Sequence, residues 1–228
     1  MEHYNDIKKW DDEFCANHVV NLVRNITKIL KEKNITNLSY IDIGANVGKV
    51  YDLLSENFVI NKVWMYEASP ILFEYIKEKY SSDSKVIVNN NVVLDRSGKI
   101  QFDQSSLIYE INNNQHNLNL GLSKIGNSNH STEVDSIKIS DVILNTSEIQ
   151  NDVTFIKIDT ENVDFNILND LFDVIRQFKN KPIIEFEINY FVSNMNISDA
   201  QFILDKYVDL GYNKIDLRSI SGDGILIP

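Results

Sequence analysis

Asp42, Gly44 and Gly48 directly follow an apolar run in the stretch YIDIGANVGKV. Glycines at a turn between a buried strand and a helix let a ligand approach the backbone closely. The turn is not the phosphate-binding loop of mononucleotide enzymes, because its glycines are too close together and Val50 replaces the required Ser or Thr. It is a weak match to a dinucleotide-binding turn, because Asn46 occupies the place of the glycine that approaches the pyrophosphate.

The residues around this turn fit S-adenosylmethionine better, because the methionine end of that molecule carries an amine and a carboxylate. Asp42 or the Gly44 carbonyl could accept hydrogen bonds from the amine, and a helix N-terminus near Gly48 would favour the carboxylate. Glu67 ends the next apolar run, where a carboxylate can accept hydrogen bonds from both ribose hydroxyls of a nucleoside. We therefore predict a site for S-adenosylmethionine beyond the ends of the first two strands.

Apolar patterns along the chain predict strands that alternate with amphipathic helices. The strands are expected at residues 39–43, 61–67, 85–89, 153–159 and 182–188. A Gly-rich turn between the two final apolar runs indicates a β-hairpin that adds an antiparallel strand. Such alternation is typical of a doubly wound, mostly parallel α/β sheet. Ligands bind these sheets at the carboxyl ends of the strands, where Glu67, Asp159 and Glu187 are expected.

The chain has 228 residues without a repeat, a Pro-rich linker or an abrupt change of composition, so we expect a single domain over residues 1–228. Residues 1–37 are expected to form an N-terminal helical segment, in which the apolar spacing over 7–33 fits one long helix or two in series. The core is expected over residues 38–228. Within it, residues 103–132 are rich in Asn, Ser and Gln, which indicates a long polar surface insertion.

Five segments of the chain resemble the FkbM-type methyltransferases in order and spacing: YIDIGANVGKV, MYEASP, VVLDRSGKIQF, FIKIDTENVDFNIL and PIIEFE. The resemblance covers roughly residues 38–190, and the first and fourth segments are the most specific. It implies a Rossmann-like class I methyltransferase fold, with a seven-stranded sheet and a C-terminal antiparallel hairpin, that uses S-adenosylmethionine. It also implies, most often, O-methylation of a sugar hydroxyl on a glycan or a glycosylated product.

The resemblance also implies roles for particular residues. It places the methionine end of S-adenosylmethionine against four residues of the turn: Asp42, Gly44, Asn46 and Gly48. It makes Glu67 the ribose acceptor and places Asn90 or Asn91 near the adenine. Three residues of the fourth segment would border the transferred methyl group: Lys157, Asp159 and Glu161. The chain departs from the family pattern Lys-x-Asp-x-Glu-Gly-x-Glu, because Asn162 replaces the glycine and Asp164 replaces the last glutamate.

Methyl transfer to a hydroxyl needs a base or a metal, because a hydroxyl is a poor nucleophile at neutral pH. Asp159, at the end of a central strand, is the first candidate for the base, and Glu187, at the end of the next strand, is the second. Together with Glu161 they could also hold Mg²⁺, which prefers oxygen ligands, so the metal requirement stays open. A structural alternative is that Asp159 and Glu161 cap the following helix and that Lys157 only neutralises these carboxylates.

Other polar residues have weaker claims to a role in the site. We expect Glu185 to face solvent or to make a polar contact. His116 and His130 lie in the polar insertion, where either could contact a substrate or act as a base. The sequence has no cluster of Cys and His, so a zinc site is not expected.

The formal net charge of −11 disfavours nucleic acid as a partner, because an acidic surface repels phosphate backbones. Cys15 is the only cysteine, so no internal disulfide can form. The polar N-terminus has no secretory signal, and no apolar stretch approaches the ~20 residues that a membrane helix needs. We therefore expect a cytoplasmic protein that acts on a small-molecule or glycan acceptor, without a membrane partner; a homodimer is an open alternative.

Two other functions stay open at the level of sequence. The same fold could methylate a different acceptor, such as an amine, a small natural product or nucleic acid, of which the acidic charge disfavours the last. Alternatively, the chain could be an inactive scaffold protein that binds S-adenosylmethionine. The replacements at Asn162 and Asp164 are the only support for that alternative.

Overall fold

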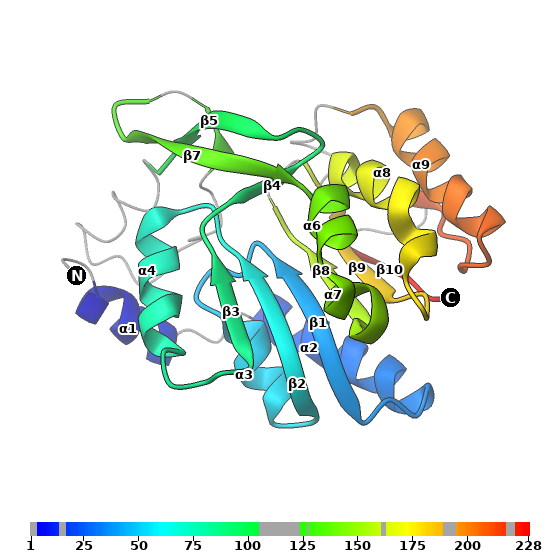
Figure 1. Cartoon of the computed structure of the whole chain (residues 1–228), viewed down its shortest axis with the longest axis horizontal. Helices are drawn as coiled ribbons and strands as arrows, with labels where there is room; N and C mark the ends of the chain where they lie inside the picture. Colours follow the sequence, from blue (N-terminus) through cyan, green and yellow to red (C-terminus); the bar gives the residue numbers. More distant parts are fainter. Residues whose placement is uncertain are drawn as a thin grey trace.

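The computed structural model describes residues 4–13, 17–104, 124–126, 128–160, 163–188, 195–217 and 222–228. Within them, six strands form a central sheet in the order β10-β9-β8-β1-β2-β3 (Figure 1). In chain order, these strands are β1 (Asn37–Ile43), β2 (Val59–Tyr66), β3 (Val86–Asn89), β8 (Phe155–Ile158), β9 (Ile183–Ile188) and β10 (Gly222–Leu226).

Neighbouring strands of this sheet run parallel, except that β10 runs antiparallel to β9. This confirms the predicted α/β class, a doubly wound and mostly parallel sheet. β1 and β8 are buried along almost their whole lengths, as parallel strands covered on both faces require. The expected seven strands and C-terminal hairpin agree with the structure in outline, since six strands lie in the described residues and β10 is the antiparallel one.

Helices cover both faces of the sheet (Figure 1). One face packs against α1 (Tyr4–Glu13), α2 (Asn17–Glu32), α3 (Lys49–Ser55) and α4 (Pro70–Lys79). The other packs against α6 (Ile139–Asn145), α7 (Ser147–Asp152), α8 (Asp164–Val174), η2 (Ile175–Gln177) and α9 (Ile197–Asp209). Two cores result, because successive side chains of a strand point to opposite faces: Tyr40 belongs to the first core, and Ile41 and Ile43 belong to the second.

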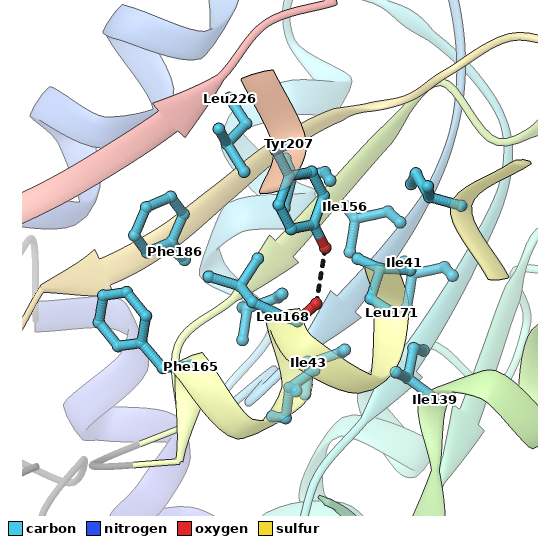
Figure 2. Packing of buried hydrophobic residues seen from close by; sticks show 14 of the residues in the cluster. Ile41, Ile43, Ile139, Ile156, Phe165, Leu168, Leu171, Phe186, Tyr207 and Leu226 are labelled. Atoms are coloured by element: carbon cyan, nitrogen blue, oxygen red, sulfur yellow. Dashed lines mark hydrogen bonds between the residues drawn. The ribbon is translucent and has the colours of Figure 1, made fainter. Parts of the chain in front are cut away.

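The second core fixes the start of α8 and the end of β9, which flank the predicted catalytic carboxylates. Phe165 at the start of α8 packs edge to face on Phe186 of β9, with ring centroids 5.6 Å apart (Figure 2). Tyr207 of α9 lies fully buried in the same cluster, and its hydroxyl donates a hydrogen bond to the Leu168 carbonyl at 2.7 Å. Because that bond satisfies the buried hydroxyl, α9 is held against α8 at a defined position.

The helix boundaries follow local sequence signals. Of the two alternatives for residues 7–33, the structure shows two helices, α1 and α2. Ser69 is the N-cap of α4, and its hydroxyl accepts a hydrogen bond from the Leu72 amide at 3.4 Å. The N-cap of α9 is Asn196, whose side chain accepts hydrogen bonds from two backbone amides of the first turn. No helix in the described part of the chain is long and apolar enough to cross a membrane.

A second, four-stranded sheet has the order β4-β7-β5-β6 and consists of β4 (Val92–Leu94), β5 (Gly98–Asp103), β6 (Lys124–Ile125) and β7 (Ser131–Lys138). Figure 1 shows β5 and β7 beyond the carboxyl ends of β1 and β2. The small apolar core of this second sheet packs on Ala68 and Val163, which lie next to the predicted site. The expected insertion at residues 103–132 thus contributes β6 and the start of β7, and residues 105–123 and 127 lie outside the described part.

Candidate functional site

The turn after β1 has a backbone that only certain residues tolerate. Gly44 and Gly48 both have φ of 78°, and Asn46 has φ of 52°, all in the left-handed region. A Cβ atom at Gly44 would lie 1.8 Å from the backbone oxygen of Asp159, and one at Gly48 would lie 2.4 Å from the Tyr80 hydroxyl. The atoms that approach these two glycines closely therefore belong to the chain itself, and the predicted contact of the turn with a ligand stays a prediction.

Glu67 ties the end of β2 to this turn. Its Oε2 atom accepts a hydrogen bond from the Asn46 amide at 2.8 Å, and its Oε1 atom accepts one from the Ser69 amide at 2.8 Å. Burial raises the pKa of Glu67 to about 7, although the two backbone hydrogen bonds act in the opposite direction. Each carboxylate oxygen keeps a second lone pair, so the side chain can accept further hydrogen bonds from a ligand.

A buried row of charged side chains crosses three neighbouring strands. The strand register places Asp42 of β1 opposite Lys157 of β8, and Lys157 opposite Glu185 of β9. The Lys157 ammonium lies 3.2 Å from Asp42 Oδ1 and donates a hydrogen bond to the Gly44 carbonyl at 3.0 Å. Asp42, Lys157 and Glu185 are at most 3% exposed. The ammonium therefore neutralises buried carboxylates and also holds the turn.

The pKa values in this row follow from burial and charge. Burial alone would lower the pKa of Lys157, but the carboxylates of Asp42, Asp159 and Glu185 outweigh it and the pKa is raised. Burial raises the pKa of Asp42, against the opposing effect of Lys157. Burial also raises the pKa of Glu185. The expectation that Glu185 faces solvent is wrong, and the alternative of a polar environment holds, since its charge interacts with Lys157 across the strand pair.

Three carboxylates gather at the carboxyl ends of β8 and β9. The Asp159 side chain is 36% exposed and lies 3.4 Å from the Lys157 ammonium. Burial raises the pKa of Glu187 to about 7, with further contributions from Asp159 and Asp223. Asp164 is 4% exposed, and burial, followed by the charges of Asp159 and Glu187, raises its pKa well above the ordinary value. This end of the site therefore carries more negative charge than Lys157 compensates.

The capping alternative for Asp159 does not hold in the described residues. The N-cap of α8 is Val163, and no side chain forms a capping hydrogen bond there. Within the part of the chain that the structure describes, no group of three or more His, Cys, Asp or Glu residues is arranged to hold a metal ion. Glu161 and Asn162 lie outside that part.

The two adenine candidates differ in their surroundings. The Asn90 side-chain amide donates hydrogen bonds to the backbone oxygens of Glu67 and Ala68, at 2.9 and 3.1 Å. The Asn91 amide instead contacts the backbone oxygen of Asp135 in β7, at 3.4 Å. Asn90 is therefore the one that the structure brings to the Glu67 turn. His130 is exposed, and His116 lies outside the described residues.

Sequence reasoning missed two side chains that hold the turn. Lys79 at the end of α4 donates a hydrogen bond to the Val47 carbonyl at 3.0 Å. The Tyr80 hydroxyl lies 2.9 Å from the Gly48 carbonyl and can donate to it. No local motif marks either residue, since their proximity to the turn depends on how α4 packs beside α3.

Comparisons with known proteins identify the family of the chain. The sequence profile of the Methyltransferase FkbM domain matches residues 42–214, which is most of the chain. Comparison with curated proteins gave no match.

Among solved structures, the chain is similar to Methyltransferase FkbM from Methylobacillus flagellatus KT, with 14% identity and a TM-score of 0.52. The match covers 99% of this chain and 59% of that protein, so this chain spans about three fifths of its length. It is also similar to a putative caffeoyl-CoA O-methyltransferase from Staphylococcus aureus, with 12% identity, a TM-score of 0.47 and coverage of 99% and 90%. At 14% identity, the similarity to the first of these structures shows the fold alone, the class I methyltransferase fold. The profile match shows the family: the chain belongs to the FkbM family of S-adenosylmethionine-dependent methyltransferases.

Proposed function

We propose that this protein transfers the methyl group of S-adenosylmethionine to a hydroxyl group of a sugar, on a glycan or a glycosylated small molecule. The observation that carries the proposal is the carboxylate cluster at the ends of β8 and β9. It lies one strand away from the turn that ends β1, and Glu187 in it has a pKa of about 7. A general base works best when its pKa lies near the working pH.

The buried groups near the turn fit the charge of S-adenosylmethionine, which carries an ammonium group, a sulfonium group and one carboxylate. Within the described part of the chain, Asp42 Oδ2 is buried without a hydrogen-bond partner, so it could accept a hydrogen bond from the ammonium group. Glu67 would accept hydrogen bonds from the ribose hydroxyls through its remaining lone pairs. When bound, S-adenosylmethionine supplies an electrophilic methyl group on a positively charged sulfur.

The chain's own carboxylates would prepare the acceptor. Glu187 Oε2 is buried and has no hydrogen-bond partner among the residues that the structure describes, so it can accept the proton of the acceptor hydroxyl. Asp159 instead forms an ion pair with the Lys157 ammonium at 3.4 Å. We therefore assign the base to Glu187, the second candidate from the sequence, and assign Asp159 to hydrogen bonding with the acceptor.

A sugar fits this end of the site, because carboxylates with free oxygens accept hydrogen bonds from several hydroxyls at once. The second sheet lies beyond the same strand ends, where it could shape the acceptor pocket (Figure 1). The FkbM resemblance adds the expectation of a glycan or glycosylated acceptor.

The test is a transfer assay with S-adenosylmethionine labelled in its methyl group and a panel of acceptors. The panel would contain neutral sugars, a glycosylated natural product, a simple amine and a short RNA. We expect labelled methyl ethers on a sugar-containing acceptor only. Transfer to the amine or the RNA alone would reject the sugar proposal, and binding of S-adenosylmethionine without transfer to any acceptor would favour the scaffold alternative.

A further inference from the structure

Two consecutive carbonyls of the glycine turn are held by the C-terminal end of α4. Lys79 donates a hydrogen bond to the Val47 carbonyl at 3.0 Å, and the Tyr80 hydroxyl lies 2.9 Å from the Gly48 carbonyl and 2.8 Å from Asp52 Oδ1, with one hydrogen for both acceptors. Gly48 is one of the left-handed residues of the turn. These side chains therefore fix the backbone between β1 and α3, which is the segment expected to hold the methionine end of S-adenosylmethionine.

Lys79 is itself held by carboxylates from two other helices. Its ammonium donates to Asp52 Oδ2 in α3 at 2.8 Å and to Asp11 Oδ2 in α1 at 2.5 Å. With Val47, these acceptors use all three hydrogens of the ammonium group. The Lys79 side chain is only 19% exposed, so water cannot easily replace a lost partner.

The carboxylate of Asp11 in α1 is buried, which is unusual for a charged side chain. Its side chain is 5% exposed, and its Oδ2 atom also accepts a hydrogen bond from the Tyr75 hydroxyl at 2.8 Å. Lys49, which directly follows Gly48, donates to the Asp11 backbone oxygen at 3.2 Å. Asp11 thus contacts α4 through its carboxylate and the start of α3 through its backbone oxygen, and its Oδ1 atom lies 3.6 Å from the Lys49 ammonium.

Apolar contacts hold α1 in the same place. Ile7 is 1% exposed in the core of this face, and the rings of Tyr4 and Tyr75 lie 5.2 Å apart. Figure 1 shows α1 beside α4, outside the central sheet. The matched family domain begins at residue 42, so α1 lies outside it, although Lys49 and Lys79 inside it depend on Asp11.

We propose that α1 positions the turn that binds S-adenosylmethionine, acting through Asp11 and Lys79. The proposal rests on the proposed function. Both are positioning residues that do not touch the ligand. Removing the Asp11 charge leaves the Lys79 ammonium with one carboxylate fewer, so Lys79 shifts and releases the Val47 carbonyl. A displaced turn binds its ligand less tightly even when the rest of the fold is intact.

The test compares the affinity of the full chain for S-adenosylhomocysteine in Asp11→Asn and in the control Asp12→Asn. Asp12 lies next in the same helix, is exposed, and forms an ion pair with Lys8 of the same helix. We expect Asp11→Asn to raise the Kd about tenfold, within the ~5–150-fold range typical of coupling between two sites. Asp12→Asn should leave the Kd unchanged. Lys79→Met should likewise raise the Kd, and the exposed control Lys77→Met should leave it unchanged.

The melting temperature separates positioning from simple destabilisation. Combining Asp11→Asn with Lys79→Met should raise the Kd little beyond either single change, because both break the same chain of contacts. A lower melting temperature with an unchanged Kd in both single variants would overturn the proposal. If the wild-type chain does not bind S-adenosylhomocysteine or S-adenosylmethionine, the proposed function fails and this inference fails with it.

Hydrogen exchange of the wild-type protein provides a test that needs no variant to fold. Peptides covering residues 4–13 and 44–52 should both exchange more slowly when S-adenosylhomocysteine is bound. Slower exchange in the turn with unchanged exchange in α1 would contradict the proposed coupling.

Discussion

The two sides of the candidate site are built differently. On the side of β1 and β2, the backbone of the turn is held by the chain itself, although Asp42 Oδ2 has no hydrogen-bond partner among the described residues: Glu67 accepts two backbone amides, and Lys157 holds the Gly44 carbonyl. On the side of β8 and β9, Asp164 and Glu187 each keep a buried oxygen without a hydrogen-bond partner. The backbone on the first side is therefore shaped before any ligand arrives, whereas the second side holds charge that a ligand or a proton must compensate.

The largest expected effect tests how rigid the turn is. Gly44→Ala places a methyl carbon against the Asp159 backbone oxygen at a left-handed φ, so the free energy of unfolding should fall by about 4 kcal/mol or more. Gly126→Ala is the control, because nothing lies within 4 Å of its added Cβ, and it should stay within about 0.5 kcal/mol of wild type. Urea unfolding of both variants gives the comparison. Equal free energies of unfolding for Gly44→Ala and Gly126→Ala would show that the close approach of Gly44 to the Asp159 backbone oxygen does not fix the turn.

The next effect concerns catalysis on the carboxylate side. Glu187→Gln removes the proposed base, so the rate of methyl transfer should fall about 10²–10⁴-fold while the Kd for S-adenosylhomocysteine stays unchanged. In the wild type, the rate should rise with pH through the Glu187 pKa of about 7, because only the ionised carboxylate accepts a proton. Glu56→Gln, an exposed control, should leave the rate unchanged. Loss of activity in Asp159→Asn but not in Glu187→Gln would reverse the assignment of the base.

A smaller effect should appear in the pH dependence of stability. The pKa values of Glu67 and Glu187 in the folded protein are raised from 4.5 to about 7. Between the unfolded-state pKa and the folded-state pKa, the folded protein therefore binds more protons than the unfolded chain. Their stabilising contribution is complete below the unfolded pKa and is lost as the pH rises through about 7. For the buried Glu67 this is on the order of 3 kcal/mol. Chemical unfolding at several pH values measures it, and stability that increases across this window would contradict the shifts.

The smallest expected effect separates the two asparagines that follow β3. Asn90→Ala removes two hydrogen bonds to the backbone of the Glu67 turn and should weaken binding of S-adenosylhomocysteine by about 1 kcal/mol. Asn91→Ala should change the affinity little, since its amide contacts Asp135 instead. Calorimetric titration of both variants would show the difference. A larger effect at Asn91 would place the adenine against β7.

Local sequence predicted the parts of the site that depend on the ends of parallel strands. Asp42, Glu67 and Asp159 were expected near one another, because such ends meet at one edge of the sheet. The burial of Glu185 could not be predicted, because it depends on the register that places it opposite Lys157.

The second sheet was missed for a similar physical reason. β5 and β7 pair across a polar stretch with weak periodicity, so no local pattern marks the partners. The same holds for Asp11, whose carboxylate looks like part of a solvated acidic run until α1 packs against α4. Contacts between segments far apart in the sequence determine the burial of Glu185, the second sheet and the burial of Asp11.

Calorimetric titration of the wild-type chain with S-adenosylmethionine and S-adenosylhomocysteine, repeated on Asp42→Ala and Glu67→Ala, tests the central claim most directly. We expect micromolar binding of both ligands to the wild type and its loss in both variants, with folding confirmed by circular dichroism. Wild-type affinity in the folded variants would show that the turn after β1 and Glu67 do not hold the methyl donor. Absence of binding to the wild type would contradict the account as a whole.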